Sequence, residues 1–363
     1  MRLFQNSGLY PAYLTRLNRL AAGAVTFTER RNVFLADRYG ASHFLKPVLE
    51  GETTAFFTNG DDRELQRLWA HENGLPHKAT RDDILRAQLE AHRTEVFYNI
   101  DPMRYSSAFI NHLPGTVRCK VAWRAAPSPG ADFSGYDLVV CNFPSILESY
   151  RRAGWKAAWF APAHDPVMDA YATNTERPID VLFVGGYSRH HRQRAEVLDA
   201  VAARGRDLKV VFHLNRSRLT RIAESPIGSL LPLRKYRRPS DIRRVTENPI
   251  FGTELYKALS SAKIVLNGAV DMAGEDRGNM RCFEAMGCGA LLVSDAGRYP
   301  HGMVDGESFL AYGCASEAAA VIERSLQSSE RTLTIANRGL RLVQSAYSKA
   351  TQWRAFQSLV ETT

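Results

Sequence analysis

The sequence lacks the features that mark membrane-spanning and secreted proteins. No stretch approaches the roughly 18 consecutive apolar residues that a membrane-spanning helix needs. Residues 1–8 contain no long apolar segment of the kind that a secretory signal peptide requires. These absences predict a cytoplasmic protein, either free or attached peripherally to the inner face of a membrane.

Cysteine and histidine form no recognisable metal-binding pattern. The five cysteines are odd in number and scattered, which is typical of free thiols in a reducing compartment. The ten histidines include no His-Glu-x-x-His cluster. The phosphate loop Gly-x-x-x-x-Gly-Lys-[Ser/Thr] is also missing, which argues against a nucleotide triphosphatase. We therefore expect neither a bound metal nor a cofactor.

What the sequence does have is an ordinary globular composition with an excess of positive charge. Apolar residues make up 45% and charged residues 23%, and 363 residues suit two domains.

The net charge is +9, and nine arginines and lysines lie within 215–244 against two acids. The plainer interpretation of this segment is a solvated loop. Anionic partners are the alternative: a nucleotide diphosphate, a phospholipid-linked molecule, a membrane surface or nucleic acid. Nucleic acid is disfavoured because no helix-turn-helix, zinc or RNA-binding signature accompanies the charge.

Both halves of the chain alternate strand-like and helix-like stretches, which predicts α/β domains with parallel, doubly wound sheets. A proline-containing segment, 161–178, separates the halves and is predicted to be a linker. In the first half we predict strands at 1–5, 32–35, 53–58, 95–100, 118–123, 136–141 and 157–160, with helices at 61–73, 81–92 and 144–153. In the second half we predict strands at 180–184, 208–214, 263–267, 290–294 and 308–312, with helices at 192–204, 254–260, 316–326, 331–346 and 350–360.

One stretch, 277–295 (RGNMRCFEAMGCGALLVSD), carries most of the functional information. It predicts a loop, a short helix, a glycine stop and a buried strand, preceded by another strand at 262–267. Such a unit binds ligands at the carboxyl ends of its strands, where the helix N-terminus offers N–H groups to a phosphate. Arg281 and Glu284 share a helix face, and Asp276 lies eight positions before Glu284. Arginine suits a diphosphate and carboxylates suit sugar hydroxyls, so the pattern favours a sugar nucleotide. The plainer alternative is that these residues only build the core and cap a helix.

This stretch resembles the C-terminal domain of GT-B glycosyltransferases, in particular the CgeB-like (spore maturation) branch with its N-M-R-x-x-E-A-x-G-x-G-A-L-L motif. It is also similar to the two-acid motif of glycosyltransferase family four, in which two acids hold the donor sugar and the ribose. The first of these acids is Asp276 here, in place of the usual glutamate. Segments 252–267 and 179–186 resemble the family's helix-then-strand lead-in and its first strand with a glycine turn. The resemblance covers the second half well and the first half in outline.

The resemblance implies a GT-B fold, in which two Rossmann-like domains face a central cleft. Residues 1–165 would form the acceptor domain, with a C-terminal helix at about 347–363 crossing back to it, and 178–346 the donor domain. The implied reaction moves a hexose from a nucleotide diphosphate sugar, with UDP favoured, to a hydroxyl of a glycan, lipid-linked or small-molecule acceptor. The sequence has no Asp-x-Asp motif, which holds a metal ion in transferases of the other large fold, so we expect metal-independent transfer.

Strand ends and motif positions supply the candidate site residues. The catalytic candidates are Asp101, Asp276 and His164, although Asp101 precedes proline in a favoured turn pair and His164 suits a hinge turn. The acceptor candidates follow first-half strands and are Asn6, Gly8 and Arg124. The donor candidates are Gly185, Gly186, Arg189, Asn215, Asn279, Arg281 and Glu284; the two glycines would let the backbone approach a diphosphate, or would simply form a turn.

Other functions remain open from the sequence alone. A sugar-nucleotide epimerase or hydrolase on the same fold would turn over the donor without an acceptor. A GT-B-like module could bind a nucleotide and catalyse nothing. The basic segment 216–244 could contact a membrane peripherally, or it could bind nucleic acid in a strongly salt-dependent manner.

Overall fold

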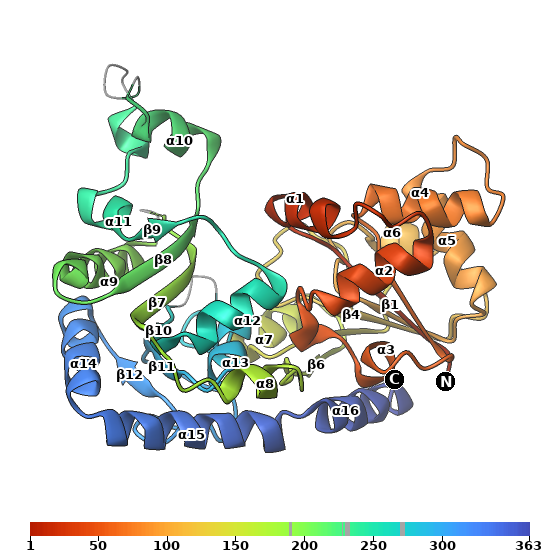
Figure 1. Cartoon of the computed structure of the whole chain (residues 1–363). Helices are drawn as coiled ribbons and strands as arrows, with labels where there is room; N and C mark the ends of the chain where they lie inside the picture. The colour runs from red at the N-terminus through yellow and green to blue at the C-terminus, as the bar shows by residue number, and fades with distance from the viewer. Residues whose placement is uncertain (189–190, 227, 229–232, 269–272) are drawn as a thin grey trace. The chain divides into compact units, whose positions relative to one another are not determined.

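The chain divides into two compact units, each built on one six-stranded sheet of parallel strands (Figure 1). The first unit comprises Met1–Ala163 and Tyr347–Thr363, and the second comprises His164–Ala346. The predicted α/β architecture with two doubly wound parallel sheets is confirmed. The computed structural model describes residues 1–188, 191–226, 228, 233–268 and 273–363.

The sheet of the first unit has the strand order β2-β1-β3-β4-β5-β6. β1 and β3 are buried along their whole length, as expected for parallel strands that helices cover on both faces. The strands are β1 (Leu3–Ser7), β2 (Ala55–Asn59), β3 (Val96–Asn99), β4 (Cys119–Trp123), β5 (Leu138–Cys141) and β6 (Ala157–Trp159).

The helices predicted at 61–73, 81–92, 144–153 and 350–360 are present in the first unit, whereas the prediction for 32–35 fails. That short apolar run was expected to be a strand, and this expectation is wrong because it lies inside α2. A capping box starts α2: Thr26 Oγ1 accepts the Glu29 N–H at 3.2 Å, and the Glu29 carboxylate accepts the Thr26 N–H at 3.0 Å. The helices are α1 (Pro11–Leu20), α2 (Phe27–Ala36), α3 (Lys46–Leu49), α4 (Arg63–Glu72), α5 (Arg81–Ala91), α6 (Ser107–Ile110), α7 (Pro144–Arg152) and α16 (Lys349–Glu361).

The C-terminal helix α16 belongs to the first unit and is anchored there by a buried lysine. Lys349 Nζ donates to the carbonyl oxygens of Ala41 at 2.7 Å and Phe44 at 2.8 Å. Further along the helix, the ring of Phe356 packs against Tyr98 and Phe160. One ammonium group therefore connects the start of α16 to several carbonyls of a buried turn.

We predict that Lys349→Met lowers the free energy of unfolding by about 3 kcal/mol, because two buried carbonyls each lose a charged hydrogen-bond donor. The measurement is chemical denaturation followed by circular dichroism. Lys78→Met is the control, since Lys78 is exposed, and it should change stability by less than about 0.5 kcal/mol. Equal stability of the two variants would show that the Lys349 hydrogen bonds contribute nothing.

The sheet of the second unit has the order β12-β11-β10-β7-β8-β9. Its core is formed by apolar side chains from β7, β8, β10 and β11, together with residues of α9, α14 and α15. The strands are β7 (Ile179–Gly186), β8 (Val210–Asn215), β9 (Thr246–Glu247), β10 (Ala262–Leu266), β11 (Leu291–Asp295) and β12 (Leu310–Tyr312). The helices are α8 (Met168–Ala172), α9 (Arg192–Ala203), α10 (Arg218–Glu224), α11 (Ser240–Arg244), α12 (Gly252–Ser260), α13 (Met280–Gly287), α14 (Ala315–Gln327) and α15 (Ser329–Ala346).

The second unit begins at His164, so residues 164–177 pack with it instead of forming a free linker. The ring of Tyr171 in α8 lies 5.8 Å from that of Tyr256 in α12. A Cβ atom at Gly287 would lie 2.5 Å from Met168 Sδ, so the missing side chain lets α8 approach α13 closely. Within the described ranges, no helix combines the length and apolar character that crossing a membrane requires.

Candidate functional site

Each sheet has a switch point where ligands of open α/β sheets bind. In the second unit β7 lies between β10 and β8, and in the first unit β1 lies between β2 and β3. The connections on either side of such a strand run in opposite directions, so the loops beyond its carboxyl end diverge. Polar side chains gather at both places.

A buried asparagine organises the end of β10. Asn267 Nδ2 donates to Ser294 Oγ at 3.0 Å, and Asn267 Oδ1 accepts Asn279 Nδ2 at 3.2 Å. Asn279 in turn caps α13, since its Oδ1 accepts the Arg281 N–H at 3.0 Å. Tyr312 Oη donates to the Asn267 carbonyl at 2.6 Å. The candidate Asn279 is therefore a helix cap that fixes where α13 begins.

Arg281 and Glu284 lie on one face of α13, as the spacing predicted. Arg281 Nη1 donates to Glu284 Oε2 at 2.6 Å, and Glu284 is buried, with a relative exposure of 4%. Burial raises the pKa of Glu284, the nearby Asp165 adds to this, and Arg281 opposes it. The pair therefore presents a carboxylate and a guanidinium that already neutralise each other.

Asp276, the first acid of the motif, is also buried and has an arginine partner that the spacing did not reveal. Arg298 Nη2 and Nε approach Asp276 Oδ1 at 2.6 and 2.7 Å. Next to it, Arg277 forms an ion pair with Asp295 at the end of β11. The loop before α13 is thus held by two arginine–carboxylate pairs, whose charges would otherwise be unpaired in a buried place.

The glycine pair Gly185-Gly186 extends β7 by two residues beyond the predicted strand and pairs with β8. A Cβ atom at Gly185 would lie 2.6 Å from Arg194 Nη2, so only glycine lets this arginine lie across the strand end. The Arg194 guanidinium stacks 5.0 Å from the Phe183 ring centre. Sequence reasoning missed Arg194, although it stands near the start of α9. Arg189, predicted here, lies outside the described residues.

Asn215 is the exposed last residue of β8 and lies opposite Gly186 in the register. His164 has a different environment from the one expected for a catalytic group. Its Nε2 lies 2.8 Å from Asp169 Oδ1, its side chain is 4% exposed, and Nδ1 faces Gly287 of α13. This packing between α8 and α13 favours a structural role for His164.

At the switch point of the first unit, two strands end in the same local motif. Asn59 Oδ1 accepts the Asp61 N–H at 3.0 Å, and Asn99 Oδ1 accepts the Asp101 N–H at 3.1 Å. Each asparagine thereby turns the aspartate two residues later toward Gly8. A Cβ atom at Gly8 would lie 3.0 Å from Asp61 Oδ2 and 3.1 Å from Asp101 Oδ2. The repeated Asn-x-Asp spacing was the signal for Asp61, and it went unnoticed in the sequence.

The candidate Asn6 connects these loops. Its Nδ2 donates to Asn99 Oδ1 at 2.9 Å, and its Oδ1 accepts the Gly60 N–H at 2.9 Å. Asn6 is fully buried, so it shapes the loops and is not exposed to a ligand. The structure brings Asn6, Gly8 and Asp101 together at this edge of the sheet.

Burial and neighbouring charges shift the pKa of Asp101. Burial raises the pKa of Asp101, and the like charge of Asp61 raises it further, while Arg104 and Arg124 oppose the shift. Arg124 also donates from Nε to Ser128 Oγ at 2.7 Å. A carboxyl with a raised pKa beside a glycine loop is suited to exchanging a proton with a bound hydroxyl.

We predict that Asp61→Asn lowers the pKa of Asp101, because the substitution removes a neighbouring negative charge. Arg124→Gln should raise the same pKa, because it removes a neighbouring positive charge. The carboxyl carbon of Asp101, followed by NMR across a pH titration, reports both shifts. An unchanged pKa in both variants would mean that burial alone sets the pKa of Asp101.

The basic segment 216–244 is less uniformly charged at its surface than the sequence implied. Arg238 is 6% exposed, and its Nε and Nη2 approach the two oxygens of Glu224 at 2.7 and 2.8 Å. Arg244 pairs with Asp241 at 3.0 Å. Both acids of the segment are thus used internally, whereas Arg218 and Arg221 in α10 are exposed.

Among the described residues, no group of three or more histidine, cysteine, aspartate or glutamate side chains is arranged to hold a metal ion. The site geometry therefore consists of arginines, carboxylates, carboxamides and helix N-termini.

Comparison with known proteins identifies what this arrangement is similar to. A family model described as glycosyl transferase-like matches residues 192–358. These residues include Arg194, Asn267 and the whole of α13. No curated protein matches the chain.

Solved structures share the fold across the whole chain. HepE from Anabaena, in complex with UDP and glucose, is 14% identical with a TM-score of 0.60, and the match covers 100% of both chains. A glycosyltransferase from Rickettsia africae is 9% identical with a TM-score of 0.57, covering 99% of this chain and 97% of that one. Sucrose-phosphate synthase from Thermosynechococcus elongatus is 13% identical with a TM-score of 0.52, covering 99% and 98%. At these identities the likeness establishes the fold, which is GT-B.

Proposed function

We propose that this chain, a glycosyltransferase of the GT-B fold, moves a hexose from a nucleotide diphosphate sugar to an acceptor hydroxyl without a metal ion. The observation that carries the proposal is the cluster at the end of β7 and β10. There Arg194, the N-terminus of α9 and the N-terminus of α13 bring positive charge to one sheet edge, inside the stretch that the family model matches. UDP is the favoured nucleotide because HepE was solved with UDP and with UDP-glucose.

In this proposal the donor binds at the second unit through residues of two loops. Arg194, Gly185 and Gly186 receive the diphosphate, and Arg281 supports the negative charge that develops as it leaves. Glu284 accepts hydrogen bonds from the ribose or the sugar hydroxyls, and Asp276 contacts the donor sugar. Because both acids are already paired with arginines, a donor would have to share or displace these partners. Asn215 and Asn279 complete the rim of this site.

The acceptor binds at the first unit in the same proposal. Asp101 takes the proton of the attacking hydroxyl, and Asp61 holds a second hydroxyl of the acceptor beside Gly8. Arg124 lies near enough to Asp101 to oppose the rise in the pKa of Asp101. In this proposal, Arg124 contacts an anionic group of the acceptor. This division gives each unit one substrate.

The test of the function is donor binding and turnover. We predict that UDP binds the wild-type protein and that Arg194→Ala weakens binding at least about tenfold, because a charged hydrogen bond contributes roughly 1.5–3 kcal/mol. Calorimetry measures the affinity. Arg192→Ala removes an equal charge from the exposed first residue of α9 and should leave the affinity within about threefold of the wild type.

UDP-glucose turnover supplies the second arm of this test. Release of UDP should increase when a hydroxyl acceptor is added and should continue in EDTA. UDP release that no acceptor accelerates would instead favour a hydrolase or an epimerase, and binding without any release would favour a nucleotide-binding module. If Arg194→Ala and Arg192→Ala weaken UDP binding to the same extent, Arg194 does not belong to the donor site.

We further propose that α10 brings the protein to an anionic membrane surface, where a lipid-linked acceptor would be found. Leu219 and Ile222 lie three residues apart in this helix and are 43% and 38% exposed. Arg218 and Arg221, also three apart, are exposed beside them. Exposed apolar side chains flanked by arginines suit the interface of an anionic bilayer. The buried Arg238–Glu224 ion pair fixes the end of the helix.

We predict that Leu219→Asp/Ile222→Asp reduces binding to vesicles that contain phosphatidylglycerol by about tenfold or more, because each apolar side chain contributes on the order of 1 kcal/mol to insertion. Co-sedimentation measures the binding. The control is Val304→Asp/Leu333→Asp, which changes two other exposed apolar residues of the second unit. Equal losses in the two variants would show that added negative charge, and not α10, determines the binding.

A further inference from the structure

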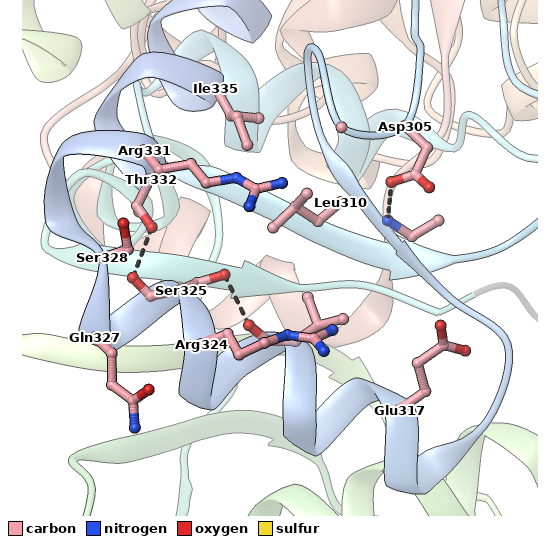
Figure 2. A pocket seen from close by; sticks show the side chains of 13 residues that line it. Asp305, Leu310, Glu317, Arg324, Ser325, Gln327, Ser328, Arg331, Thr332 and Ile335 are labelled. Atoms are coloured by element: carbon pink, nitrogen blue, oxygen red, sulfur yellow. Dashed lines mark hydrogen bonds between the residues drawn. The ribbon is translucent and has the colours of Figure 1, made fainter.

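A cavity of about 570 Å³ lies in the second unit at the outer edge of its sheet (Figure 2). Its walls come from β12, the Asp305–Gly306 turn, one side of α14 and the start of α15. The volume is in the range of small-molecule sites. Because β12 is the edge strand, this cavity is separate from the loops at the ends of β7 and β10.

Apolar side chains form part of the cavity lining, and two of its hydroxyl groups are already hydrogen bonded. Leu310, Val321 and Ile335 line it from three different elements. Ser325 Oγ donates to the Val321 carbonyl at 2.8 Å, and Thr332 Oγ1 donates to the Ser325 carbonyl at 2.7 Å (Figure 2). A ligand would therefore meet aliphatic surface here.

The two acids in the lining each accept a backbone hydrogen bond from a residue in β12 or directly after it. Asp305 Oδ1 accepts the Ala311 N–H at 2.7 Å, and Glu317 Oε2 accepts the Gly313 N–H at 2.7 Å. These bonds hold the turn before β12 and the start of α14. The bonds also offset part of the negative charge at this end of the cavity.

The two arginines have no comparable partner. Arg324 stands in the last turn of α14, and Arg331 in the first turn of α15, with only a short connection between the helices. Both are exposed, and within the described ranges neither guanidinium takes part in an ion pair or a side-chain hydrogen bond. Figure 2 shows both side chains reaching from their helices into the cavity.

Arg324 and Arg331 place two positive charges in the lining of one cavity, and both charges would attract an anion bound there. Guanidinium groups bind carboxylates and phosphates through paired N–H donors, so two arginines from adjoining helix ends can hold one such group. Of the described residues that line the cavity, none is aromatic, so they offer a nucleotide base no ring to stack against. The chemistry thus selects a small anion with an aliphatic body.

We propose that this cavity is a second ligand site, for a small molecule that carries a phosphate monoester or a carboxylate on an aliphatic chain. Arg324 and Arg331 hold the anionic group, and Leu310, Val321 and Ile335 contact the chain. The site is independent of the donor site, and it does not rest on the proposed transfer reaction.

The test uses octyl phosphate as the probe and the full chain, with binding measured by calorimetry. The wild type should bind one equivalent, and inorganic phosphate should bind at least about tenfold more weakly, because it lacks the aliphatic chain. Arg324→Ser/Arg331→Ser should weaken binding of octyl phosphate at least about tenfold. UDP should not displace the probe, since the two sites are separate.

The matched control is Arg338→Ser/Arg341→Ser, which removes the same charge from exposed residues of α15 that do not line the cavity. It should bind octyl phosphate within about twofold of the wild type. If both double variants lose the same affinity for octyl phosphate, the effect arises from net charge alone and the proposal fails. Displacement by UDP would assign the probe to the donor loops, and binding that the Arg324/Arg331 substitutions leave unchanged would also overturn the proposal.

Discussion

Buried carboxamides at the ends of parallel strands are the constraint on which both candidate sites depend. Parallel strands end at one edge of a sheet, and the loops that follow must satisfy their backbone N–H groups without a further strand. In the first unit Asn59 and Asn99 accept the N–H groups of the aspartates two residues later. In the second unit Asn267 holds Asn279, which caps α13. Removing any of these amides would release the loop that carries the functional side chain.

Charge is arranged differently at the two sheet edges. In the second unit the acids near α13 are buried and each faces an arginine, which the cost of an unpaired buried charge requires. In the first unit Asp61 and Asp101 flank one glycine, and burial together with the charge of Asp61 raises the pKa of Asp101, with arginines nearby as a partial balance. The paired charges of the second unit suit a ligand that carries its own negative charge. The two aspartates of the first unit suit a ligand that gives up a proton.

The alternation of strands and helices was predictable from the chain because apolar periodicity and buried runs are local signals. The helix–strand unit around α13 and the shared face of Arg281 and Glu284 followed from the same signals. The failure at 32–35 has a local cause as well: a short apolar run fits a strand or a buried helix turn, and the capping box at Thr26 decided between them. The packing of residues 164–177 on α12 and α13 could not be predicted, since it depends on the absent side chain of Gly287.

The sequence by itself determined the fold class, the order of the elements and which strand ends carry polar side chains, because each of these depends on neighbours along the chain. Only the tertiary structure decided which of those side chains meet. Arg298 contacts Asp276, which lies 22 positions away in the sequence. Asp61 and Asp101 follow different strands and meet beside Gly8, which follows β1. Arg238 is buried against Glu224, although its charge predicted an exposed side chain. Each partner is brought in by a crossover connection or a loop, and its distance along the chain carries no periodic signal. Pairing of charges in space, unlike burial of apolar residues, leaves no repeat in the sequence.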